Sequence, residues 1–157
     1  MEGFLGHTDN VTIEAFKQYV RKSDEMFHGL DVEKVSQFYL KNTTTESDRR
    51  WAAYDFYGDL LIKCPTYLFG QQMARNVKSG RNVYFYELTY EGPLITKVMG
   101  CDEKSMGICH EQDLPFVFGW PTFMPTLFTP QDILLTGQVI KMWTNFAKLG
   151  YFVIVFV

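Results

Sequence analysis

The sequence predicts an α/β fold that is mostly helical, contains one core strand and is incomplete on its own. Apolar residues recur at helical spacing along much of the chain, which is typical of amphipathic helices. Residues 82–90 are instead rich in aromatic and β-favouring side chains, and this composition predicts a strand. One strand leaves its own N–H and C=O groups without partners, and it makes no sheet for the helices to cover. The pattern therefore indicates part of a larger α/β domain.

Helices are expected throughout the first half of the chain. Thr12 is placed to cap a first helix, whose apolar side is formed by Ile13, Phe16, Tyr19 and Val20. Asp31 is placed to cap a second helix, whose apolar residues are Val32, Val35, Phe38 and Tyr39. A third helical region covers residues 47–76. Pro65 must break, kink or restart it, because proline has no amide N–H to donate.

The second half is expected to hold the strand, a loop and a final helix. Residues 82–90 carry apolar groups on both faces, which fits a strand buried within an α/β sheet. Glycine and proline mark residues 91–107 as a loop. The final helix has Thr129 as N-cap, Pro130 as its first residue, Asp132 as the capping-box acid and Gly150 at its end. Its apolar stripe consists of Leu135, Val139, Met142, Trp143 and Phe146. We expect Trp143 and Phe146 to pack in the core.

Length and composition describe one globular domain with one core. The chain has 157 residues, of which 46% are hydrophobic and 21% are charged. A net charge of −3 and the lack of a basic run argue against a nucleic-acid partner. No apolar run approaches the roughly 20 residues that span a bilayer, so we expect no membrane span in this chain. The first residues also lack the basic start and apolar core of a signal peptide.

Three cysteines and two sequons bear on the compartment. Cys101 and Cys109 are able to close a small disulfide loop in an oxidising compartment. With His110 they also suggest a metal site, but the paired C-x2-C spacing and a fourth ligand are missing, so we expect no metal and no cofactor. Asn10-Val11-Thr12 and Asn42-Thr43-Thr44 are acceptor sequences for N-glycosylation, so Asn10 and Asn42 are candidates for that modification.

His110 lies in the most informative segment of the chain, residues 107–119. Its imidazole is suited to proton transfer near neutral pH, because the unperturbed pKa of histidine is about 6.5. The segment reads Gly-Ile-Cys-His-Glu-Gln-Asp-Leu-Pro-Phe-Val-Phe-Gly. It resembles the catalytic-histidine loop of the type B carboxylesterase/cholinesterase family, roughly Gly-Val-x-His-x-x-Glu-Leu-x-Phe-Val-Phe-Gly. Ile108 replaces the valine and Asp113 the glutamate.

Four further motifs resemble this family in the same order along the chain. They are Glu2-Gly3-Phe4, Cys64-Pro65-Thr66 after Gly58-Asp59-Leu60-Leu61, the strand 82–88, and Met142-Trp143-Thr144-Asn145-Phe146-Ala147-Lys148-Leu149-Gly150. The resemblance implies that residues 1–150 are the C-terminal portion of a carboxylesterase type B domain with an α/β-hydrolase fold. Residues 151–157 form an apolar tail that departs from the family, which usually continues with Asn-Pro.

The resemblance also implies roles for individual residues. His110 would be the general base of a catalytic triad, and Glu2 the carboxylate that orients it. Asp113 takes the place of a structural acid, although the sequence leaves either Glu111 or Asp113 open as a local partner of His110. Cys64 matches a family cysteine whose usual partner lies beyond the end of this chain. The nucleophile is missing: none of the serines at positions 23, 36, 47, 79 and 105 lies in a Gly-x-Ser-x-Gly elbow.

Two functions from different classes follow from this resemblance. The first is a part of a secreted serine carboxylic-ester hydrolase that acts on a small-molecule ester, the present chain being inactive alone. The second is a non-catalytic cholinesterase-like adhesion domain; a truncated product without function is a third reading. Retention of His110 and its loop favours the first. We also expect self-association, because residues 82–90 expose strand edges and residues 151–157 are apolar and uncharged.

Overall fold

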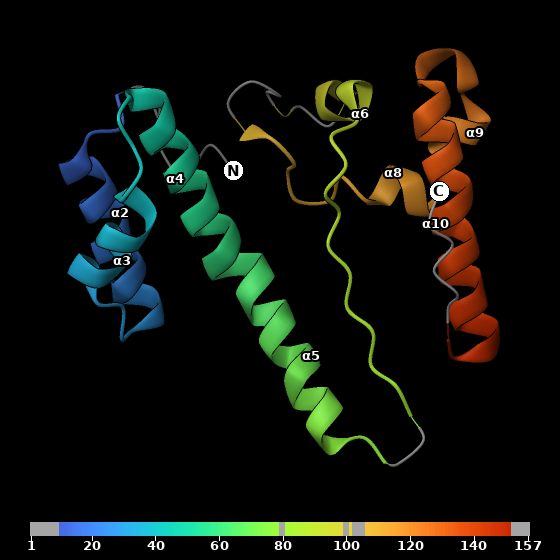
Figure 1. Ribbon diagram of the computed structural model, residues 1–157, viewed down its shortest axis with the longest axis horizontal. Helices are drawn as coiled ribbons and strands as arrows, with labels where there is room; N and C mark the ends of the chain where they lie inside the picture. The colour runs from blue at the N-terminus through green and yellow to red at the C-terminus, as the bar shows by residue number, and fades with distance from the viewer. Residues whose placement is uncertain (1–9, 79–80, 99–100, 102–105, 152–157) are drawn as a thin grey trace. The chain divides into compact units, whose positions relative to one another are not determined.

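The computed structural model describes residues 10–78, 81–98, 101 and 106–151, and these are almost entirely helices and connecting segments (Figure 1). The chain divides into two compact units, Met1–Pro65 and Thr66–Val157. Each unit is described separately below. The described residues contain no strand, so the α/β-hydrolase architecture is implied by the resemblance alone.

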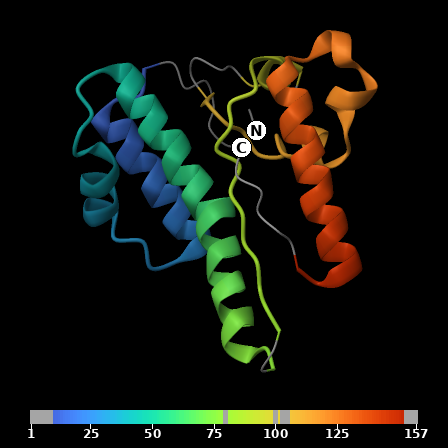
Figure 2. The same cartoon turned by 45° about the vertical axis from the view of Figure 1, so that its right-hand side comes forward.

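In the described part of the first unit, the helices α2 (Ile13–Phe27), α3 (Val32–Leu40) and α4 (Glu46–Gly58) pack together. Each pair of these helices is in contact, and Figure 2 shows them side by side. The predicted caps are confirmed, since Thr12 Oγ1 accepts from the N–H of Ala15 at 3.0 Å and Asp31 Oδ1 from that of Lys34 at 3.0 Å. The apolar stripes meet in a core formed by Val11, Phe16, Val20, Ala52, Ala53, Phe56 and Tyr57.

The predicted interruption at Pro65 takes the form of a change in helix type. After α4, the π-helix η1 (Asp59–Lys63) leads directly into α5 (Cys64–Asn76). The N–H of Cys64 reaches back to the carbonyl of Asp59. A wider turn just before a proline is a way for the chain to stay helical where an ordinary α-helical hydrogen bond is impossible. Tyr39 of α3 holds η1 in place by donating to Asp59 Oδ2 at 2.8 Å, so burial and this bond raise the pKa of its phenol.

In the second unit, the prediction of a strand over residues 82–90 is wrong. These residues form no strand; they run as an extended segment (Figure 1). The physical reason is that a strand needs a second strand to complete its backbone hydrogen bonds. The described residues contain no such second strand. The β-favouring composition thus sets the extended shape without a ladder.

The prediction that residues 91–107 form a loop is wrong in part, because α6 covers Pro93–Val98. Proline at the first position of a helix has its φ angle already set and has no N–H to lose. From residue 107 onward, the described residues form the short elements α8 (Leu114–Val117), α9 (Trp120–Phe123) and the 3-10 helix η2 (Pro125–Leu127). They lead to the long helix α10 (Pro130–Leu149).

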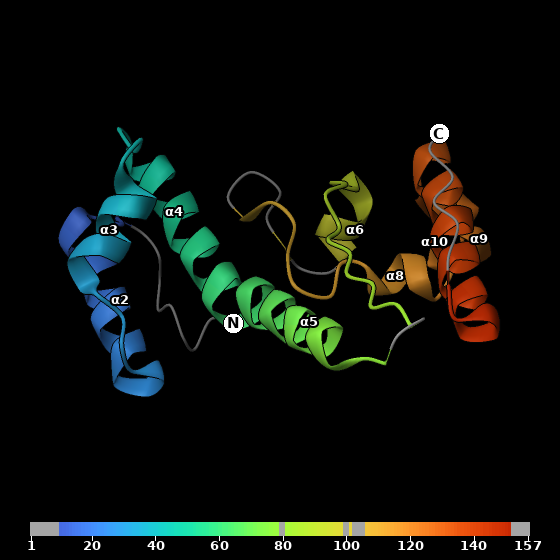
Figure 3. The same ribbon diagram turned by 60° about the horizontal axis from the view of Figure 1, so that its bottom comes forward.

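Helix α10 is bounded as the sequence predicts. Thr129 and Asp132 form a capping box, and Gly150 ends the helix in a left-handed conformation with φ 74°. Asp132 is fully buried and also accepts from the Tyr90 hydroxyl at 2.9 Å, which fixes the extended segment to the start of the helix. Both α8 and α9 pack on α10, as Figure 3 also shows. Among its described residues, the buried core of this unit is formed by Ile95, Phe116 and Phe128.

Candidate active-site loop

The loop that carries His110 is built around a tight turn. The N–H of Gln112 donates to the carbonyl of Cys109 at 3.3 Å, so His110 and Glu111 are the two central residues of that turn. Glu111 has a φ angle of 71°, in the left-handed region that favours glycine. This turn lifts the imidazole away from the core. The His110 side chain is 48% exposed.

Of the two acids near His110, Glu111 is the one that lies against the imidazole. The distance from His110 Nε2 to Glu111 Oε1 is 3.7 Å, an ion pair only when the histidine is protonated. Asp113 is engaged elsewhere, because its Oδ2 accepts from the Tyr86 hydroxyl at 2.5 Å. The two acids that the sequence leaves open as a local partner of His110 therefore have different contacts. Glu111 lies beside the histidine, whereas Asp113 binds Tyr86 of the extended segment.

Tyr86 connects the histidine loop to α10. Its hydroxyl binds Asp113, and its ring meets the ring of Trp143 edge-on with centroids 6.0 Å apart. Burial and the neighbouring Asp113 carboxylate raise the pKa of the Tyr86 phenol, so Tyr86 stays a hydrogen-bond donor at neutral pH. Asp113 precedes α8 without capping it through its side chain. That carboxylate is thus used to hold the loop.

Both ends of the loop are held in place. Upstream, Cys101 and Cys109 form a disulfide. Downstream, Phe116 is only 1% exposed, and its ring meets that of Tyr90 at 6.0 Å. Gly119 follows with φ 79°, and a Cβ there would lie 3.2 Å from Ile140 Cδ1. The Phe-Val-Phe-Gly ending therefore fixes the loop by placing one ring in the core and the backbone close to α10.

The remaining predicted residues lie apart from this loop. Cys64 is free and exposed. Asn10 and Asn42 are both exposed in turns, and Asn10 has φ 71°. Glu2 lies outside the described residues. Among those that are described, no group of three His, Cys, Asp or Glu side chains is arranged to hold a metal, and no helix is long and apolar enough to cross a bilayer.

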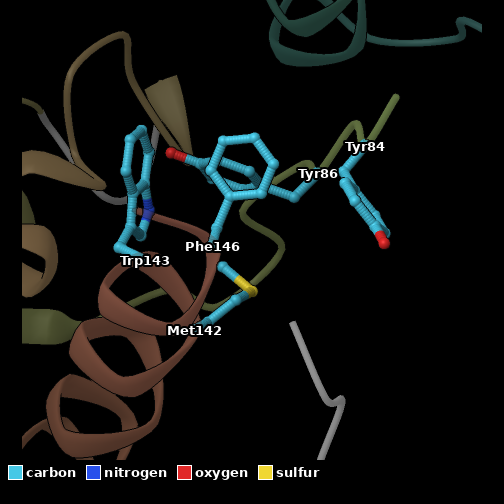
Figure 4. A pocket seen from close by; sticks show the side chains of 5 residues that line it. All are labelled: Tyr84, Tyr86, Met142, Trp143 and Phe146. Atoms are coloured by element: carbon cyan, nitrogen blue, oxygen red, sulfur yellow. The ribbon is translucent and has the colours of Figure 1, made fainter. Parts of the chain in front are cut away.

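Sequence reasoning missed an apolar pocket beside the loop. It has a volume of about 100 Å³ and is lined by Tyr84, Tyr86, Met142, Trp143 and Phe146 (Figure 4). The expectation that Trp143 and Phe146 pack in the core is wrong, since they are 42% and 45% exposed. Among the described residues, α10 meets the core through Leu135 and Val139 in its first half. The spacing of Tyr84 and Tyr86 could have indicated that both rings line one site, because residues two apart share a face of an extended chain.

Comparisons with known proteins agree with the motif in this loop. The sequence pattern of the Carboxylesterase family matches residues 7–151 of the chain. Acetylcholinesterase-1 from Trittame loki is 28% identical over 126 residues, which are 79% of this chain and 21% of that protein. Human bile salt-activated lipase is 32% identical over 107 residues, 68% of this chain and 13% of the lipase. Mouse cholinesterase is 26% identical over 148 residues, 91% of this chain and 23% of that enzyme.

The coverage is as informative as the identity. Most of the present chain aligns, yet it spans less than a quarter of the length of each of these relatives. The matched part includes the histidine loop, the extended segment and all of α10.

Proposed function

The chain belongs to the carboxylesterase family, and on that premise we propose that it forms the C-terminal portion of a serine carboxylic-ester hydrolase domain. The observation that carries the proposal is the exposed His110 on a loop fixed at both ends, inside the part of the chain that matches the family. The hydrolase belongs to the α/β-hydrolase fold, and residues 1–150 are its C-terminal portion. The tail, residues 151–157, is not part of that domain.

In this proposal His110 is the general base. It takes the proton of a serine hydroxyl as the serine attacks a small-molecule carboxylic ester, and it then protonates the leaving alcohol. Glu2 fixes the imidazole tautomer and stabilises the imidazolium ion. The serine and the oxyanion donors come from sequence outside this chain, since no serine here lies in a Gly-x-Ser-x-Gly elbow. No cofactor is needed for such an acyl transfer.

Exposure supports the remaining proposals about the parent protein. Asn10 and Asn42 are accessible to a glycosyltransferase, in keeping with a secreted glycoprotein. The disulfide between Cys101 and Cys109 fits the same oxidising compartment. Self-association of the chain is also proposed, because the extended segment has no partner strand among the described residues and carries exposed aromatic side chains. A non-catalytic adhesion role is less well supported, because it gives no reason to retain His110.

The test uses the full-length parent with His110→Gln. Turnover of an aryl ester should fall by several orders of magnitude with folding intact, because a triad base is lost. His28→Gln is the matched control; His28 is an exposed histidine at the end of α2 and should leave turnover unchanged. Glu2→Gln should give a large but smaller loss.

Two results would contradict the proposal. One is near-normal turnover in the His110→Gln parent. The other is ester turnover by the isolated 157-residue chain that an organophosphate blocks, since this would place a nucleophile among its own five serines.

A further inference from the structure

His110 lies between two residues of its own loop that are fixed in place. On the upstream side, Cys109 is joined to Cys101 by a disulfide. On the downstream side, Gln112 is only 1% exposed, and its N–H donates to the carbonyl of Cys109 at 3.3 Å. His110 and Glu111 are the two residues between these fixed points, and both are exposed. The backbone at Cys109 and Gln112 therefore decides where the imidazole lies.

Both sides of the loop lead back to the same core. Cys101 follows helix α6, whose Ile95 is buried in one cluster with Phe116, and Phe116 lies downstream of the histidine. The two cysteines are eight positions apart in sequence, so their bond shortens the covalent path from α6 to Cys109. A cross-link of this kind removes conformational freedom from the chain that it closes. The residue before His110 is thus tied to the core by more than the main chain.

The side chain of His110 has little of its own to hold it in this chain. It is half exposed, and the Oε1 atom of Glu111 is 3.7 Å from its Nε2 atom. At that distance the two atoms form no hydrogen bond. A general base must come within hydrogen-bond distance of the proton that it takes, so a displaced backbone displaces the reacting nitrogen as well. Positioning of the imidazole therefore depends on the backbone anchors.

We propose that the disulfide between Cys101 and Cys109 positions His110 for proton transfer, so that ester hydrolysis by the parent requires the oxidised pair. The inference rests on the proposed function. The pattern that this loop resembles, Gly-Val-x-His, leaves the residue before the histidine open, so the cysteine is a feature of this chain. A dithiol reductant breaks the S–S bond by giving up two electrons and two protons. Both cysteines become thiols, and the reductant closes to its own disulfide.

The first experiment measures ester hydrolysis by the full-length parent with Cys101→Ser, Cys109→Ser or both changes. Each variant should lower kcat roughly 10- to 100-fold and leave KM unchanged, because the base is displaced while the ester still binds. Since both single changes remove the same bond, the double variant should lose no more than either one. A dithiol should lower kcat of the parent sequence more than that of the double variant, which lacks this bond and is the matched control.

The second experiment needs no ester. It follows backbone hydrogen exchange by mass spectrometry in the 157-residue chain, with Cys64→Ser in every sample so that no third thiol exchanges with the pair. Breaking the disulfide should open the turn at Gln112, and peptides that cover residues 107–113 should exchange about tenfold faster. Peptides from α2 should exchange as before, and they serve as the internal control.

The outcomes separate this inference from the proposed function. A selective loss of kcat together with faster exchange around His110 supports the positioning role. Unchanged kcat in a parent that needs His110, unchanged exchange, or a loss in the Cys109 variant alone overturns it. Faster exchange in α2 as well would mean that the bond stabilises the whole chain, and this also overturns the positioning role. If the His110→Gln parent keeps its turnover, the proposed function fails, while exchange in the chain still decides whether the disulfide holds the histidine.

Discussion

Glu111 adopts a backbone conformation that most side chains avoid. Its φ angle is 71°, and its carboxylate gains only a 3.7 Å approach to a histidine that is half exposed. A left-handed residue other than glycine costs on the order of 1 kcal/mol. The turn therefore stores strain next to the proposed general base, and the hydrogen bonds that hold it are backbone ones, from the N–H of Leu114 to the carbonyl of Glu111 at 3.0 Å and from the N–H of Gln112 to the carbonyl of Cys109 at 3.3 Å.

We expect Glu111→Gly to stabilise the chain by about 0.5–1 kcal/mol, since glycine removes the left-handed penalty and loses part of that gain to its greater freedom when unfolded. Urea denaturation measures the change. Glu91→Gly is the matched control, because Glu91 has no positive φ, and it should destabilise slightly. A loss of stability in Glu111→Gly would show that the carboxylate itself holds the turn.

In the first turn of α4, the carboxylate of Asp48 accepts hydrogen bonds from the two residues that precede the helix. Asp48 Oδ2 accepts from the N–H of Thr45 at 2.7 Å and from the N–H and hydroxyl of Thr44 at 2.8 and 3.0 Å. These bonds, the backbone ones first, hold the pKa of Asp48 well below its usual range. The charged form is therefore favoured in the folded chain more than in the unfolded one.

The sign of the pH dependence follows from that lowered pKa. The stabilisation from Asp48 should be complete above the unfolded pKa of about 3.9 and should be lost as the pH falls through the lower folded value. We expect Asp48→Asn to remove this part of the acid sensitivity of helix α4, so that the difference in stability from the parent sequence shrinks as the pH falls from about 4 toward the lower folded pKa. Thermal melts followed by circular dichroism at several pH values measure it. Equal acid sensitivity in both proteins would contradict the assignment.

Elements whose signals are local could be predicted from sequence, and elements that depend on distant partners could not. The capping box of Thr129 and Asp132 lies within four residues, so its pattern was sufficient to place the start of α10. The segment 82–90 has strand composition, but a ladder depends on a second segment. The exposure of Trp143 likewise depends on which elements cover its end of α10. The histidine loop was recognisable by its motif, whereas its attachment through Tyr86 joins residues 27 positions apart.

Across the whole chain, apolar surface is divided unevenly between interior and exterior. Among the described residues of the second unit, three hydrophobic residues are buried as its core, while several large apolar side chains remain open to solvent. Three phenylalanines around one loop show the contrast: Phe116 is 1% exposed, Phe118 66% and Phe123 79%. Exposed apolar area of this kind is typical of a surface that another chain or segment covers.

These three phenylalanines should respond in opposite ways to substitution. Phe116→Ala should destabilise the second unit by about 3–5 kcal/mol, because it opens a cavity in a small core. Phe118→Ser and Phe123→Ser should leave stability nearly unchanged and lower the binding of the dye ANS, which reports exposed apolar surface. Unfolding by urea and dye fluorescence measure the two effects. Equal destabilisation by all three would mean that the exposed rings are buried in solution.

The free thiol of Cys64 allows a chemical label to be attached at the helix junction beside Pro65. The chain has three cysteines, and the other two are joined to each other, so a maleimide reagent at neutral pH should attach to one position only. That position is the first residue after the π-helix, where the helix changes type. A fluorophore or spin label placed there would report directly on whether the junction bends, and it would do so without altering a single residue of the natural sequence.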